Sequence, residues 1–159
     1  VIGGLLGWAG GGFNVSVAST TSENNLTTTG KFKDNAIGGS ATLGSVRLST
    51  AWRQFKQAGS KQTTMLVGAV MRLGSGDLKA SWVKVDMAGK VGTTVIDAND
   101  AQQLALGYVH NLSKRTALYA HFSRIDNDGA ATYVVPGGAA GIAGGKTSTG
   151  YEFGLRHNF

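Results

Sequence analysis

Two kinds of side chain alternate in the segment Tyr151-Glu152-Phe153-Gly154-Leu155-Arg156-His157-Asn158-Phe159. The odd-numbered positions are aromatic or apolar except for His157, and the even-numbered positions are polar or glycine. A period of two is typical of a β-strand with one apolar face and one solvated face. Termini of proteins in water are usually polar and frayed, so a strand that finishes on a free phenylalanine is unusual there. A lipid phase would accommodate that ring, and the segment therefore favours a strand that crosses a membrane.

The same alternation recurs along the rest of the chain at fairly even spacing. It predicts eight strands, over residues 13–19, 36–43, 46–56, 63–73, 78–86, 102–112, 116–124 and 149–159. Most approach the 9–11 residues that a tilted strand needs to cross a bilayer. For residues 1–12 the pattern does not decide between an irregular segment and an earlier strand that ends in a turn at Gly10–Gly12.

The connections between these segments alternate in length. Short turns are predicted at 43–46, 74–77 and 111–115, and long polar or glycine-rich loops at 19–34, 87–100 and 127–147. The segment 129–150 is low in charge and rich in glycine and alanine, and we expect it to be mobile. Short turns at one end and long loops at the other are typical of an outer-membrane barrel, with its turns in the periplasm and its loops outside the cell. The fold class predicted is thus all-β, a transmembrane antiparallel up-and-down β-barrel. A soluble β-sandwich that serves as a binding module is an alternative, although a sandwich has no reason to sort its loops in this way.

Composition excludes several other classes of protein. The 159 residues suffice for one domain, and they contain no run of about 18 apolar residues that would form a membrane-spanning helix. There is no cysteine, hence no disulfide framework and no thiol chemistry. The net charge of +6 raises the possibility of nucleic-acid binding. Because the positive charges are scattered singly along strand-like segments, we expect no nucleic-acid partner.

The period of two also assigns charged side chains to a face. We expect the charged residues on the wet face to line the lumen of the barrel, because an arginine or lysine facing lipid at mid-depth costs roughly 2–4 kcal/mol. A wall of positive charge would give the channel a modest preference for anions. The alternative is that these side chains are solvated and have no role in selectivity. The predicted pore-lining residues are Arg47, Arg53, Arg72, Lys79, Glu152 and Arg156.

Aromatic side chains fall on the opposite, apolar face. An aromatic stripe can be a buried core, but rings near the ends of membrane strands form girdles at the level of the lipid headgroups. We place these rings near strand ends and therefore favour a girdle. Its predicted members are Trp52, Trp82, Tyr108, Phe122 and Tyr151.

No motif in the chain predicts catalysis, a metal or a cofactor. His110, His121 and His157 lie on different strands without the spacing of metal ligands. The Gly74–Asp77 segment lacks the helix and lysine of a phosphate-binding loop and suits a hairpin turn. A barrel enzyme, such as an outer-membrane protease or acyltransferase, would need a polar catalytic cluster at its rim, and the sequence offers none. We therefore expect a protein that is not an enzyme.

Three segments resemble the general porins of Gram-negative bacteria, of the β-proteobacterial type. They are Leu106–Ala120 (LGYVHNLSKRTALYA), Gly154–Phe159 (GLRHNF) and, less specifically, Gly76–Trp82 (GDLKASW). The resemblance implies a sixteen-stranded barrel in the outer membrane, a homotrimer, and passive diffusion of small hydrophilic solutes and ions. It also implies that Phe159 belongs to the signal read by the barrel-assembly machinery.

Members of that family are about twice as long as this chain. We therefore expect residues 1–159 to be a single β-barrel unit, the C-terminal half of a longer porin whose pore-constricting loop lies in the other half. The alternative is a complete, closed eight-stranded outer-membrane barrel with an anchoring or adhesive role. Such a small barrel would be filled by its own side chains, so it would not provide an open channel.

Overall fold

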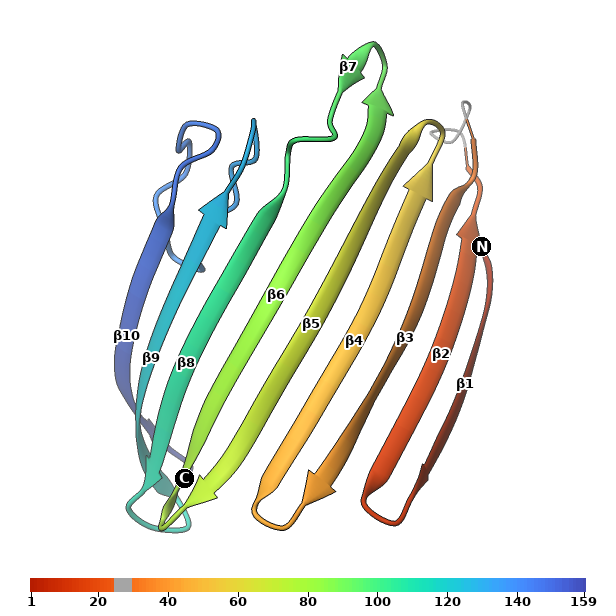
Figure 1. Ribbon diagram of the computed structural model, residues 1–159. Helices are drawn as coiled ribbons and strands as arrows, with labels where there is room; N and C mark the ends of the chain where they lie inside the picture. Colours follow the sequence, from red (N-terminus) through yellow and green to blue (C-terminus); the bar gives the residue numbers. More distant parts are fainter. Residues whose placement is uncertain (25–29) are drawn as a thin grey trace.

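The computed structural model describes residues 1–24 and 30–159, which form an antiparallel β-sheet (Figure 1). Each main strand pairs with its neighbours in the chain, in the order β1-β2-β3-β4-β5-β6-β8-β9-β10, and the short β7 pairs with the end of β6. No helix of the described residues is long and apolar enough to span a membrane. The strands are β1 (Ile2–Gly10), β2 (Phe13–Ser22), β3 (Phe32–Leu43), β4 (Val46–Gln57), β5 (Ser60–Leu73), β6 (Gly76–Val91), β7 (Thr94–Val95), β8 (Ala101–Asn111), β9 (Thr116–Asn127) and β10 (Ser148–His157).

All eight predicted strands are present, as β2 to β6 and β8 to β10, but the described residues hold two more. One is β1, whose many glycines hide the alternation of its side chains. It joins β2 through Gly11 and Gly12, which have φ angles of 57° and 82°. Glycine adopts this left-handed region without the steric cost that a side chain adds, which suits a two-residue hairpin turn. The other is β7, which returns on the end of β6 within the predicted 87–100 loop.

The predicted sorting of the connections is confirmed (Figure 1). At one end, called here the short-turn end, two-residue turns join β1 to β2, β3 to β4 and β5 to β6, and residues 112–115 join β8 to β9. The longer connections lie at the opposite, long-loop end, where the β4–β5 turn is the short exception. Residues 25–29 of the predicted 19–34 loop lie outside the described residues.

The sheet is open. Within the described residues, β1 pairs only with β2 and β10 only with β9, so that both outer strands keep one unpaired edge. A closed eight-stranded barrel would pair its first and last strands, and this alternative is therefore not supported. A β-sandwich would bury the apolar face of one sheet against another. Here the apolar side chains of the long strands stay exposed, for example Phe153 at 78%.

The loop between β9 and β10 is anchored to the sheet rather than loosely attached. The Asn127 side chain donates to the carbonyl oxygens of Tyr133 (2.9 Å) and Lys146 (2.7 Å), and accepts from the Tyr133 N–H (2.9 Å). Val135 is buried with Ala101 and Ile125, and its N–H donates to the Ser148 hydroxyl (3.2 Å). These contacts hold both ends of the loop against the sheet, and the mobility of the loop stays a prediction.

Candidate functional site

The register of the strands sorts the side chains onto two faces. One cross-strand row runs from Arg47 through Val70, Lys79, Gly107 and His121 to Glu152, so these six residues share a face, called here the inner face. Residues two positions apart on a strand also share a face. Arg53, Arg72 and Arg156 therefore lie on the inner face too, and all six predicted pore-lining residues are brought to the same side of the sheet.

The inner-face cations differ in what they bind. Arg53 makes a two-pronged contact with Asp34, from Nε to Oδ1 (3.0 Å) and from Nη2 to Oδ2 (2.7 Å), and its guanidinium lies 4.4 Å from the centre of the Phe55 ring. Arg72 lies farther from its partner, with Nε 3.7 Å from Asp77 Oδ1. Both carboxylates were missed by the sequence analysis. Asp34 and Asp77 partly cancel the positive charge that Arg53 and Arg72 bring to this face.

Three of the predicted cations have no carboxylate partner in the part of the chain that the structure describes. Arg47 donates to the neutral hydroxyl of Ser40 (3.1 and 3.3 Å), and all three side chains are exposed. Over residues 1–24 and 30–159 no carboxylate forms an ion pair with Arg47, Lys79 or Arg156. All three lie in the half of the sheet next to the short-turn end. We call them the unpaired cation set.

A hollow in the inner face joins part of this set to polar partners. Lys79, Tyr119, His121, Glu152 and Arg156 line it, and its volume is about 250 Å³. The Tyr119 hydroxyl donates to Glu152 Oε1 (3.1 Å), so the side chain of this predicted acidic residue has a hydrogen-bond partner on the neighbouring strand. The cationic groups in this hollow can therefore attract a small anion, while the carboxylate of Glu152 is engaged by a neighbour.

Glycines make room for the rings that shape this wall. A Cβ on Gly154 would collide with the Tyr119 ring, and one on Gly107 would collide with the ring of His121. Each ring thus lies over a glycine of the neighbouring strand, an arrangement that fills the gap left by the missing side chain. Both rings line the hollow together with Lys79.

The outer face carries the predicted aromatic residues. Trp52, Trp82 and Phe122 are each the last apolar outer-face residue before polar ones toward the long-loop end, and Tyr151 packs on Phe122 with ring centres 5.3 Å apart. Tyr108 lies near the short-turn end of β8. Trp82 and Tyr151 are 36% and 71% exposed, so they do not form a buried core.

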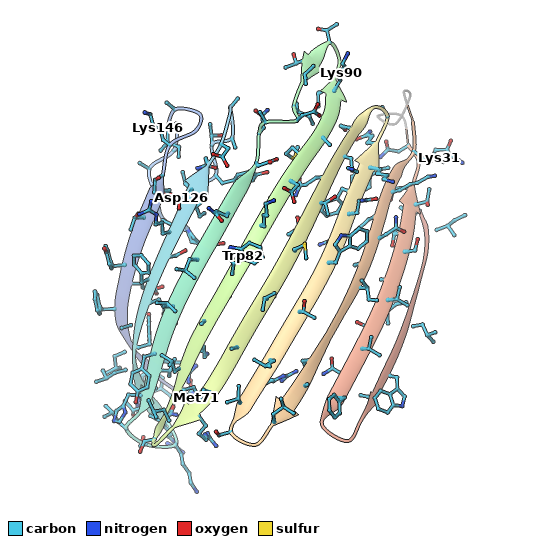
Figure 2. The ribbon with its side chains drawn as sticks, in the orientation of Figure 1. Lys31, Met71, Trp82, Lys90, Asp126 and Lys146 are labelled. Atoms are coloured by element: carbon cyan, nitrogen blue, oxygen red, sulfur yellow. The ribbon has the colours of Figure 1, made fainter. Side chains whose placement is uncertain are left out.

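The position of these rings along their strands differs from the expectation. Except for Tyr108 they lie near the middle of the strands, as Figure 2 shows for Trp82. The strands continue past the rings with charged outer-face pairs, Lys84–Asp86 (2.7 Å) and Arg124–Asp126 (2.8 Å). The rings thus mark the border of the apolar band rather than the ends of the strands. A girdle is defined by such a border, so its assignment stays a prediction with a corrected position.

Comparison with known proteins gives consistent matches. A family model described as Gram-negative porin matches residues 3–130. Outer membrane porin protein 32 of Delftia acidovorans is 45% identical over 62 residues, which are 37% of this chain and 18% of that protein. The solved structure of an anion-selective porin from Comamonas acidovorans superposes on 99% of this chain and 48% of its own, with a TM-score of 0.77 and 29% identity. The chain thus spans about half the length of that solved porin.

Proposed function

Since this chain belongs to the Gram-negative porin family and is located in the outer membrane, we propose that it forms part of the wall of a water-filled channel. Small hydrophilic solutes and ions diffuse through the channel down their gradients, and the chain catalyses no reaction. The observation that carries this proposal is the division of one sheet into two faces. The inner face is polar and holds the unpaired cation set, whereas the outer face of the same strands is apolar over the band that ends at Trp52 and Trp82.

The two free edges of the sheet support a larger barrel. We propose that residues 1–159 are the C-terminal half of a porin, in which β1 and β10 pair with strands that the other half provides. Pairing would satisfy the backbone groups that both edges leave free, which lipid cannot do. The half-length match to the solved porin agrees with this assignment. The proposed assembly is a homotrimer of such barrels.

The exposed C-terminal ring agrees with a role in assembly. Phe159 is fully exposed, and the His157 ring lies edge-on to it at 4.9 Å between ring centres. We assign Phe159 to the signal that the barrel-assembly machinery reads during insertion.

The unpaired cation set suggests that the channel prefers anions. Fixed positive charge on a lumen wall raises the local concentration of anions and lowers that of cations. The relative from Comamonas acidovorans is itself named an anion-selective porin. Three positive charges without an ion-pair partner among the described residues outweigh the single Glu152, which shares a hollow with Lys79 and Arg156.

The experiment measures the reversal potential of the full-length porin in a planar bilayer under a gradient of potassium chloride. The expected sign corresponds to a higher permeability for chloride than for potassium, and the preference weakens at high salt because mobile ions screen the wall. A reversal potential of the opposite sign would contradict the assigned anion preference. Absence of any conductance from correctly folded protein would contradict the channel itself.

A further inference from the structure

Three lysines stand side by side on the outer face near the long-loop end. Lys33 of β3 lies opposite Lys56 of β4, and Lys56 lies opposite Lys61 of β5. Adjacent strands are about 4.8 Å apart, and like charges directly opposite one another repel. All three side chains are exposed. We call them the lysine row.

The lysine row has no acidic partner in the described part of the chain. The ion pairs there belong to other residues. On the adjacent β6, Asp86 lies opposite Thr63, and its carboxylate pairs with Lys84. Residues 25–29, which the structure does not describe, contain no aspartate or glutamate. An uncompensated row of like charges on adjacent strands is unfavourable by itself, so it points to an anion supplied from outside the chain.

The residues next to the lysine row form two further layers. One step toward the short-turn end, Asn35, Gln54 and Thr63 form a cross-strand row of amides and a hydroxyl. One step further, the corresponding row is Ile37, Trp52 and Met65. Each step of two residues extends for about 6.6 Å along a strand. Positive charge, neutral hydrogen-bonding groups and apolar surface thus follow one another along β3, β4 and β5.

From this order we propose that β3, β4 and β5 bind the phosphate-bearing headgroup of a lipid in the membrane leaflet at the long-loop end. The lysine row contacts the phosphate. Asn35, Gln54 and Thr63 form hydrogen bonds to the polar region of the lipid between its headgroup and its acyl chains. Ile37, Trp52 and Met65 contact the acyl chains. The proposal rests on the orientation assigned above, in which the outer face meets lipid. The layers favour a lipid over free phosphate, because a free anion would have no use for the apolar row.

The test uses the full-length porin and diphosphoryl lipid A as the probe, titrated in detergent micelles. In one variant all three residues of the lysine row are replaced, as K33Q/K56Q/K61Q. A control variant, K31Q/K90Q/K146Q, removes the same charge from the same end of the sheet, at the positions labelled in Figure 2. A second control, K33R/K56R/K61R, keeps the charge of the row. Lysines near an anionic surface each strengthen binding several-fold, so the first variant should bind lipid A at least about tenfold more weakly.

Both controls should bind lipid A within about threefold of the wild-type protein. Lipid A without its phosphates should bind the wild-type protein as weakly as diphosphoryl lipid A binds the first variant, and millimolar inorganic phosphate should not displace the lipid. Unchanged binding by K33Q/K56Q/K61Q, equal loss in the K31Q/K90Q/K146Q control, or displacement by phosphate would each overturn the proposal. Single-channel conductance of the same variants is measured in parallel. Because the row lies outside the lumen, its replacement should not change the conductance. The binding assay therefore tests the lipid site, and the conductance tests the proposed channel.

Discussion

Arg47 and Arg53 lie on the same strand and the same face, six residues apart, yet they have different surroundings. Arg53 is held by both oxygens of Asp34 and by the ring of Phe55, whereas Arg47 donates to the neutral hydroxyl of Ser40. The same contrast holds for the other cations of the inner face. Arg72 lies beside Asp77 close to the short-turn end, whereas Lys79 and Arg156 have no ion-pair partner among the described residues. The side-chain type alone therefore does not identify the residues that set the potential of the wall.

The largest effect is expected from neutralising the cations that are not compensated. Replacing Arg47, Lys79 and Arg156 by glutamine should remove most of the anion preference, because three fixed charges leave the wall while Glu152 stays. The reversal potential of the full-length porin, measured as above, should move to or beyond the value for equal permeabilities. If the preference persists in the triple variant, Arg53, Arg72 or another part of the porin sets it.

A second expected effect concerns the shape of the wall at the hollow that Lys79 and Arg156 line. Gly154→Ala places a methyl group where the Tyr119 ring lies, so the ring must move and its bond to Glu152 is strained or lost. We expect a loss of about 1–3 kcal/mol in the free energy of unfolding, as for other overpacked sites. Urea unfolding in detergent micelles measures it. Gly68→Ala is the matched control, because the nearest atom to its new methyl group would be 3.7 Å away, and it should cost much less. Equal losses in both variants would remove the special role given to Gly154.

The smallest effect is expected from the compensated pair. The double variant D34N/R53Q removes one charge of each sign, so the reversal potential should stay within experimental error of the wild-type value. The pair is partly exposed, and such pairs contribute about 0.2–1 kcal/mol. Urea unfolding of the double variant should show a loss of that order. A clear shift of the reversal potential would mean that Arg53 acts on permeating ions despite Asp34, which would weaken the comparison with Arg47.

The period of two was sufficient to predict the face of each charged residue, since one face of a strand is fixed by alternation alone. It could not reveal which cations are compensated. Asp34 is 19 positions from Arg53 and reaches it diagonally across the β3–β4 pair, so the contact depends on register and on side-chain direction. The glycines of β1 carry no side chains that could alternate, so the pattern does not decide whether residues 1–12 contain a strand.

The packing of the β9–β10 loop was also beyond the reach of periodicity. Val135 is a single apolar residue in a segment without a repeat, and its burial depends on Ser148 and on Gly150, which leaves space under its side chain. The position of the aromatic border along the strands also differs from the prediction. Strand length does not measure membrane depth here, because the strands extend well past the apolar band toward the long-loop end.

The strict neighbour-to-neighbour pairing of the long strands has a consequence for folding. Each hairpin closes over a short stretch of chain, and the entropy lost on closing a loop grows only slowly with its length. Strands can therefore be added to the growing sheet one after another, each finding the edge that its predecessor has just formed. In the proposed barrel the last step differs, because it pairs the first and last strands, which come from opposite ends of the polypeptide. This closing step should be the slow one, because contacts between residues far apart in sequence are the slowest to form.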